Sequence, residues 1–263
     1  MFPSVLSTSR RALLTGLGLT AAALLAGCVV PREARTPLDT LRLPAVPGQR
    51  ADTLIVILPG VREVPLDIVQ HGLVAQVRER GIDADVVVAD THIAYFRQLA
   101  VIGRLRDDVI APARKGGYRR IWLAGISLGG YGALLYAMQH PGDIDGVVAI
   151  APYVASTGIL EEVNAAGGLA HWQAPDSPAQ ADTGRRLLAW LQGQASTPGR
   201  PPLYIGYGRN DPLQPGDPLM TGILPPQHIL DVPGAHDWGP WRQIWAQALD
   251  LAFPTRTGAR QGR

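Results

Sequence analysis

The sequence predicts an α/β protein built on a mainly parallel sheet with helices on both faces. Short, continuous apolar runs, typical of strands covered on both faces, alternate with stretches of helical periodicity. The 263 residues, 46% hydrophobic and 17% charged, are enough for one large domain with a substantial core. Because ligands of such sheets bind outside the carboxyl ends of the strands, the residues directly after each strand are candidates for a site.

The elements are expected in alternating order. The first half should contain a short strand near Leu41–Leu43, strand Thr53–Leu58, helix Pro65–Arg80, strand Ala84–Ala89 and helix Leu99–Arg114. The second half should contain strand Arg120–Gly125, helix Leu128–His140, strand Gly146–Ile150, helix Asp182–Gln192, strands Pro202–Tyr207 and Gln227–Val232, and helix Trp238–Phe253. On the last helix, we expect the core-facing side to carry Trp238, Trp241 and Trp245.

The N-terminal segment has the pattern of an export signal. Arg10 and Arg11 precede an uncharged apolar stretch over residues 12–26, which is shorter than the roughly 20 residues of a membrane-spanning helix. Such a stretch fits the core of a signal peptide. It ends in Leu25-Ala26-Gly27-Cys28, which resembles the lipobox of bacterial lipoproteins. The alternatives are a short core helix that buries Cys28 and, for the route, a twin-arginine signal, which Ser9-Arg10-Arg11 also resembles.

The lipobox resemblance implies that residues 1–27 are removed and that lipid on Cys28 anchors the chain to a membrane of the bacterial cell envelope. Loss of two arginines lowers the 24 basic residues to 22, equal to the 22 acidic ones, so the formal net charge falls from +2 to zero. No basic excess remains to predict nucleic-acid binding. Cys28 is the only cysteine, so a disulfide is excluded once it is acylated. Val29, where an aspartate would resemble an inner-membrane retention signal, favours the outer membrane, facing the periplasm.

The pentapeptide Gly125-Ile126-Ser127-Leu128-Gly129 is the most informative motif. It lies between a predicted strand and a predicted helix, which is the context of a G-x-S-x-G nucleophile elbow. Such a turn strains the serine backbone and lifts its Oγ clear of the sheet. The residues two positions away on either side must be small, and both are glycine. The alternative is an ordinary glycine-rich turn.

A nucleophilic serine needs a base, and the base needs an orienting carboxylate. Asp211 follows the penultimate strand in a G-x-x-D sequence, and His236 follows the last strand in a G-x-H-D-W sequence. Asp217 is an alternative carboxylate. Asp237 is another, although its place next to His236 in the chain is unfavourable for the required geometry.

In their order and placement after strands, these three motifs resemble the α/β-hydrolase family over residues 50–253. The resemblance implies that Ser127 is the nucleophile, His236 the base and Asp211 the orienting carboxylate. It implies hydrolysis of a small carboxylic ester through an acyl-serine intermediate, without a cofactor. Thioester hydrolysis, peptide hydrolysis and acyl transfer use the same residues, and a catalytically idle binding protein of the envelope is the alternative outside enzymes.

The resemblance also implies an oxyanion hole of two backbone N–H groups. Leu128, directly after the serine, should supply one of them. The other is expected from Pro59-Gly60-Val61-Arg62, where family members have His-Gly. Because proline has no N–H group, the donor is Gly60, Val61 or Arg62, and alignment with His-Gly favours Val61.

Further residues after predicted strands are candidates for substrate contact, with hydrogen-bonded loop residues as the alternative: Arg62, His92, Tyr95, Tyr153 and Arg209. Metal-ligand spacing is absent among the other histidines, His71, His140, His171 and His228. The sequence also lacks a phosphate loop and a dinucleotide fingerprint, so we expect neither a metal nor a cofactor. It does not indicate an oligomeric state.

The alternation of strands and helices lapses between Ala151 and Arg200. A segment of about 50 residues in this place indicates a lid over the site, with a plain surface excursion as the alternative. The predicted organisation is a signal peptide (1–27), a tether (28–50), a hydrolase domain (51–253) with a lid (152–200), and a disordered tail (254–263).

Overall fold

The computed structural model describes residues 32–174, 182–194, 197, 199–213, 220 and 222–254. The chain divides into two compact units, Met1–Glu33 and Ala34–Arg263. Of the first unit only Arg32 and Glu33 are described, so the fold below is that of the second. The predicted signal peptide, Cys28, Asp217 and nearly all of the predicted tail lie outside the described residues. Within the described ranges, no helix has the length and apolar character needed to cross a membrane.

A seven-stranded sheet in the order β1-β3-β2-β4-β5-β6-β7 forms the centre of the second unit. Its strands are β1 (Thr40–Leu43), β2 (Thr53–Leu58), β3 (Ala84–Ala89), β4 (Arg120–Ile126), β5 (Gly146–Ile150), β6 (Leu203–Gly208) and β7 (Ile229–Val232). Strand β1 is antiparallel to β3, and all other neighbours are parallel. Every residue of β2, β3, β5 and β6 is buried, as expected for strands covered on both faces. The predicted mainly parallel α/β sheet is confirmed.

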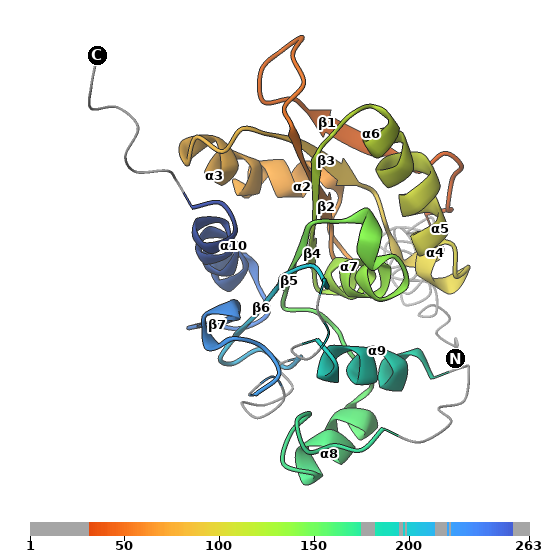
Figure 1. The fold of residues 1–263 in the computed structure, drawn as a ribbon, viewed down its shortest axis with the longest axis vertical. Helices are drawn as coiled ribbons and strands as arrows, with labels where there is room; N and C mark the ends of the chain where they lie inside the picture. The colour runs from red at the N-terminus through yellow and green to blue at the C-terminus, as the bar shows by residue number, and fades with distance from the viewer. Residues whose placement is uncertain are drawn as a thin grey trace, which may run out of the picture. The chain divides into compact units, whose positions relative to one another are not determined.

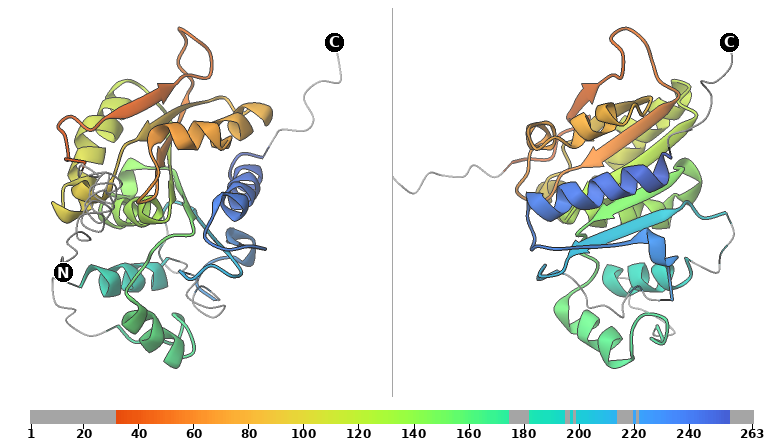
Figure 2. Two further views of the ribbon diagram at one scale, coloured as in Figure 1. Left: turned by 180° about the vertical axis from the view of Figure 1, so that it is seen from behind. Right: turned by 90° about the vertical axis from the view of Figure 1, so that its left-hand side faces the viewer.

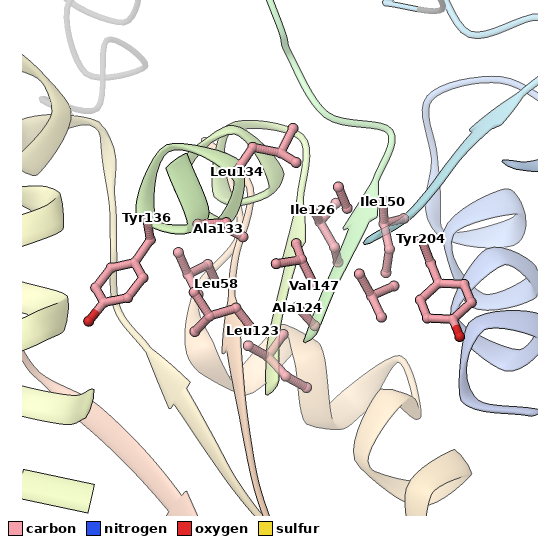
Figure 3. Close-up of a cluster of buried hydrophobic side chains, with 14 of the residues drawn as sticks. Leu58, Leu123, Ala124, Ile126, Ala133, Leu134, Tyr136, Val147, Ile150 and Tyr204 are labelled. Atoms are coloured by element: carbon pink, nitrogen blue, oxygen red, sulfur yellow. The ribbon is translucent and has the colours of Figure 1, made fainter. Parts of the chain in front are cut away.

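Helices cover both faces of this sheet (Figures 1 and 2). One face carries α2 (Pro65–Gln70), α3 (Leu73–Glu79) and α10 (Trp238–Ala252). The other carries α4 (Ile93–Arg97), α5 (Val101–Leu105), the π-helical turn η1 (Arg106–Ile110), α6 (Ala111–Lys115) and α7 (Leu128–Gln139). Figure 3 shows Ala133 and Leu134 of α7 clustered with apolar side chains of the central strands, including Leu58 and Ile126. This packing fixes α7 behind the turn that contains Ser127.

Two predicted helices differ from the observed ones. The helix expected over Pro65–Arg80 is broken into α2 and α3 at Gly72, whose φ of +80° is left-handed. The helix expected over Leu99–Arg114 begins only at Val101, because Leu99 is also left-handed, with φ of +55°. It contains η1 directly before Pro112, which lacks the N–H group that an α-helical bond would need.

Other elements also differ from the predicted ones. Helices α4 and α8 (Thr157–Ala165) were not predicted, whereas α9 (Thr183–Gln192) agrees with the expected helix, with Asp182 as its N-cap. Strand β7 is shorter than predicted, because a 3-10 turn, η3 (Pro226–His228), precedes it. The folded unit begins at Ala34 and not at residue 51, because β1 is part of the sheet.

Asp85 holds the loop between β1 and β2 on the sheet. Its side chain is buried and accepts hydrogen bonds from the backbone N–H groups of Ala45 (2.8 Å) and Ala51 (3.2 Å) and from the hydroxyl of Tyr118 (2.7 Å). Burial, followed by this bond to Asp85, raises the pKa of Tyr118 to about 12. The folded chain therefore keeps a proton that the unfolded chain releases above pH 10, and the stability from Tyr118 is lost as the pH rises from 10 towards 12.

We predict that Tyr118→Phe lowers the free energy of unfolding by about 1 kcal/mol at pH 8, because one hydrogen bond to a buried carboxylate is lost. The gap between variant and wild type should shrink as the pH rises above 10. Urea unfolding of both proteins at several pH values measures this gap, and the other tyrosines cancel in the comparison. A gap that stays constant up to pH 12 would contradict the role assigned to Tyr118.

Candidate active site

Ser127 lies in the turn between β4 and α7 with φ of +52° and ψ of −113°. Non-glycine residues rarely adopt a positive φ, and such strain is found where the surrounding structure enforces it. The enforcing bonds are present. The Ser127 N–H donates to the carbonyl of Ile150 (2.8 Å), and the Ser127 carbonyl accepts from the N–H groups of Tyr131 (3.0 Å) and Tyr153 (3.3 Å).

The glycines on either side of the turn are required by close backbone contacts. A Cβ atom on Gly125 would lie 2.2 Å from the carbonyl oxygen of Gly129, across the turn. A Cβ atom on Gly129 would lie 2.1 Å from the carbonyl oxygen of Leu58 and 2.4 Å from that of Pro59. The predicted need for small residues at both positions is confirmed. The second pair of distances also shows that the loop after β2 lies directly against the first turn of α7.

The loops that follow β6 and β7 are bound to each other. The Asn210 N–H donates to the carbonyl of Gly234 (2.9 Å), and a Cβ atom on Gly208 would lie 2.4 Å from the same oxygen. These contacts bring Asp211, in the first loop, beside His236, in the second.

Asp211, His236 and Ser127 form a continuous hydrogen-bonded chain. The Nδ1 atom of His236 is 2.7 Å from Oδ2 of Asp211, and its Nε2 atom is 3.0 Å from Oγ of Ser127. The other oxygen of Asp211, Oδ1, accepts from the N–H group of Leu213 (2.7 Å). The Asp211 side chain has no solvent exposure, whereas that of His236 is 24% exposed. Because a carboxylate only accepts hydrogen bonds, Nδ1 carries the proton and Nε2 is free to accept the one on Ser127.

The alternative carboxylate Asp237 has another task. Its Oδ1 atom accepts from the N–H group of Gly239 (2.8 Å), which caps the N-terminus of α10. Asp211 and Asp237 are the two candidate carboxylates that the structure describes, and of these only Asp211 bonds to the His236 ring.

Trp241 packs against His236, a contact that the sequence did not reveal. The two rings are edge-on, with centroids 5.0 Å apart and planes at 83°. Trp241 and Trp245 are buried, as predicted for the core-facing side of α10, whereas Trp238 is half-buried and stacks on His71 at 3.9 Å. The contact could have been anticipated, because Trp241 comes only five residues after His236, in the first turns of the predicted last helix.

The predicted oxyanion donors lie on two segments that meet at Gly129, namely α7 and the loop after β2. Leu128 is the first residue of α7, where backbone N–H groups have no acceptor within the helix. Val61 is half exposed and follows the segment that packs on Gly129. Sequence reasoning missed Glu63, whose carboxylate lies directly against Gly60 and accepts from the N–H group of Arg62 (3.3 Å).

Two of the predicted substrate contacts are buried. Tyr95 is 1% exposed, and its hydroxyl both donates to the Arg35 carbonyl (3.1 Å) and accepts from the Arg35 N–H (2.9 Å). The prediction for Tyr95 is therefore wrong, because its polar atom binds the N-terminal segment of the unit. His92 is also buried, with its ring against that of Tyr95 at 4.7 Å.

The other three predicted contacts are exposed. The guanidinium of Arg209 pairs with Asp231 at 2.8 Å. Arg62 follows the Gly60-Val61 pair in the loop after β2. Tyr153 is nearest to Ser127 through its backbone, and its ring packs edge-on against Tyr131 (5.5 Å). No cluster of His, Cys, Asp and Glu suited to a metal ion occurs among the described residues.

Comparison with known protein families gives one match, over the central part of the chain. Residues 111–217 match the family model Esterase, described as "Putative esterase". The match covers less than half of the chain and includes Ser127 and Asp211, but not His236. No curated protein matches the chain at a significant level.

Solved structures share the fold at low sequence identity. FphF, a fluorophosphonate-binding serine hydrolase of Staphylococcus aureus, has a TM-score of 0.55 at 16% identity, over 83% of this chain and 94% of its own. A ferulic acid esterase has a TM-score of 0.54 at 16% identity, over 81% and 95% of the two chains. An S-formylglutathione hydrolase of Staphylococcus aureus has a TM-score of 0.53 at 18% identity, over 85% and 98%.

The fold is that of the α/β-hydrolases. The esterase match over residues 111–217 supports a hydrolase that acts on esters.

We predict that Gly125→Ala displaces the Ser127 turn and destabilises the protein by about 1–3 kcal/mol, because the new methyl group would meet backbone and not a flexible side chain. Gly142→Ala is the matched control, since no atom lies within 4 Å of the added Cβ. Thermal unfolding and ester hydrolysis measure the two effects. Equal behaviour of the two variants would contradict the close packing of this turn.

Proposed function

We propose that the chain cleaves carboxylic esters through an acyl-serine intermediate, with Ser127 as the nucleophile, His236 as the general base and Asp211 as the orienting carboxylate. The observation that carries this proposal is the continuous hydrogen-bonded chain from Asp211 through His236 to Ser127. Its serine end is the strained residue of a strand-turn-helix elbow, in which the side chain is held towards the base.

The proposed reaction has two halves. Ser127 Oγ attacks the carbonyl carbon of the ester while His236 Nε2 accepts its proton. His236 then returns the proton to the leaving alcohol as the carbon–oxygen bond breaks, which leaves the acyl group on Ser127. In the second half, water gives its proton to His236 and attacks the acyl carbonyl, and Ser127 Oγ leaves and recovers the proton. The buried carboxylate of Asp211 stabilises the imidazolium that forms in each half.

For the oxyanion of each tetrahedral intermediate, we propose the backbone N–H groups of Leu128 and Val61 as donors. The N-terminus of α7 favours negative charge through its unpaired N–H groups. The close approach of Gly129 to the carbonyls of Leu58 and Pro59 shows that the loop that carries Val61 lies close to this helix end. Arg62 and Tyr153 remain candidates for substrate contact.

Thioesters, amides and transfer to an alcohol remain alternatives on the same residues. The solved structures that share this fold include a ferulic acid esterase and an S-formylglutathione hydrolase, so the fold accommodates both oxygen esters and thioesters. The alternative of an idle binding protein requires no particular distance between Ser127 and His236, and their hydrogen bond favours an enzyme.

We propose that α8 and α9 form the lid of this site. Arg185 on α9 is bonded to Glu162 on α8 (2.6 Å) and to Asp182, and the Trp172 indole N–H donates to Glu162 (2.8 Å). These bonds join the two helices into one unit, and the bond from Arg185 holds the pKa of Glu162 below its usual value. Because α9 packs against α7, the unit lies next to the helix that follows Ser127 (Figure 1).

For location, we propose that lipid on Cys28 anchors the protein to the outer membrane, facing the periplasm. The support is the Leu25-Ala26-Gly27-Cys28 sequence after an apolar stretch of signal-peptide length.

We predict that the full chain in detergent is labelled by a fluorophosphonate probe and hydrolyses p-nitrophenyl esters, and that Ser127→Ala abolishes both. Loss of the nucleophile removes the atom that forms the covalent bond. In-gel fluorescence and a chain-length series of esters measure the two activities. A folded wild-type protein that does not react, or labelling that survives in Ser127→Ala, would overturn the enzyme proposal.

We predict that Asp211→Asn lowers kcat by about 10⁴-fold, as expected when the base loses its orienting carboxylate. Asp237→Asn is the matched control. It should leave kcat within a few-fold of wild type and change stability by only a few tenths of a kcal/mol, because the amide oxygen of asparagine can still accept the Gly239 N–H and cap α10. Ester hydrolysis and thermal unfolding of both variants separate the roles. Reversed effects on kcat would show that the assignment of the carboxylate is wrong.

A further inference from the structure

Exposed apolar side chains concentrate at the edge of the sheet where Ser127 lies. The exposed large hydrophobic residues among those described are Val46, Val61, Val64, Leu66, Leu99, Tyr153 and Leu251. Five of these seven follow the carboxyl end of a parallel strand: three after β2, one after β3 and one after β5. Val46 follows β1, which is antiparallel and ends at the opposite edge of the sheet. We call these five, Val61, Val64, Leu66, Leu99 and Tyr153, the apolar rim. Exposed apolar residues gathered around a site indicate a surface that meets an apolar partner.

Leu99 is the most exposed member of this set. The residue is 90% exposed, and its φ of +55° is a conformation that leucine rarely adopts. The turn is fixed by the bonds from the Leu99 N–H to the Phe96 carbonyl (3.1 Å) and from the Ala100 N–H to the Tyr95 carbonyl (2.9 Å). A strained, fixed turn therefore presents a leucine to the surroundings and gains no burial from it within the fold.

The N-terminal segment enters the folded unit at the helix that precedes Leu99. The hydroxyl of Tyr95, on α4, holds the backbone of Arg35 through two hydrogen bonds (2.9 and 3.1 Å). Three residues later, the Leu38 N–H donates to Asp108 (2.8 Å), and the Leu38 side chain is buried. The chain that leads back to Cys28 is thus attached at α4, four residues before Leu99.

The distance from this attachment to Cys28 is limited by the covalent chain. Seven residue-to-residue steps lead from Cys28 to Arg35, and a fully extended chain spans at most about 3.4 Å per step, or about 24 Å. Lipid on Cys28 would therefore keep α4 within about 24 Å of the bilayer surface. Attachment at the opposite end of the sheet would have turned the apolar rim away from that surface.

The α4 corner is continuous with the surroundings of Ser127. Phe96, on α4, stacks on Tyr131 with ring centroids 6.2 Å apart, and Tyr131 packs edge-on against Tyr153 at 5.5 Å. The backbone N–H groups of both tyrosines bind the Ser127 carbonyl. Figure 1 shows α4 beside α7, on the same face of the sheet. An apolar path thus connects the attached corner with the nucleophile.

We infer that the apolar rim docks on the lipid bilayer that holds acylated Cys28, so that the site takes acyl esters from that bilayer. The inference rests on the proposed lipid anchor and, for the substrate, on the proposed esterase activity. Its partner is a phospholipid surface, which the attachment at α4 and the short chain to Cys28 select over a partner protein.

The test places a fluorophore at two exposed leucines. Leu99→Cys and the matched control Leu251→Cys, at the other end of the fold, are expressed as full chains, labelled with an environment-sensitive maleimide and placed in vesicles of phosphatidylethanolamine and phosphatidylglycerol. We expect the label at position 99 to be quenched several-fold more by spin-labelled lipids, and to emit at shorter wavelength, than the label at 251. Equal quenching at both positions, or none at either, would overturn docking.

Two controls separate the proposals. Cys28 is the only native cysteine, so wild type should not react with maleimide if it is acylated. A reactive wild type would overturn the anchor and the docking together. Fluorophosphonate labelling of both variants reports on the esterase proposal. Both maleimide-labelled variants could fail to react with the fluorophosphonate while the fluorophore at position 99 alone is quenched. In that case docking stands, and the esterase proposal and the bilayer-ester substrate are overturned.

Discussion

The strained turn at Ser127 is the constraint on which the site depends. With a φ of +52°, Ser127 has the backbone conformation of neither β4 nor α7, between which it lies. Strain of this kind costs about 1–3 kcal/mol. The turn persists because β4 is buried between β2 and β5 and because α7 packs on those strands. Gly125 and Gly129 permit the close approach that this packing needs. The hydrophobic core therefore stabilises the conformation that the serine alone would avoid.

The rest of the site depends on where that turn places Oγ. Asp211 and His236 come from loops after β6 and β7, which are neighbours in the sheet but lie two and three strands from β4. Backbone contacts between these loops fix the carboxylate, and the edge of Trp241 limits where the imidazole can lie. The resulting distances of 2.7 and 3.0 Å leave His236, the proposed base, aligned before any substrate arrives. Such alignment in advance is what proton transfer during attack requires.

Much of this arrangement could be predicted from the sequence, for a physical reason. The carboxyl ends of parallel strands meet at one edge, so Ser127, Asp211 and His236 could be placed together from their positions after strands. Contacts between residues that are far apart in the sequence could not be predicted. Tyr95 looked like a substrate contact, but it binds Arg35, sixty residues earlier in the chain. The break at Gly72 was missed because a glycine within a helical pattern is compatible with either outcome.

Detection of an acyl group on Ser127 tests most directly whether this residue is the nucleophile. The full chain is mixed with a p-nitrophenyl ester, quenched in acid within its first turnover, and digested for mass spectrometry. We expect the acyl mass to appear on the peptide that contains Ser127 and to disappear as turnover finishes. Ester hydrolysis that proceeds with the acyl group on another residue, or with no acylated peptide at any time under conditions that stabilise acyl esters, would contradict it.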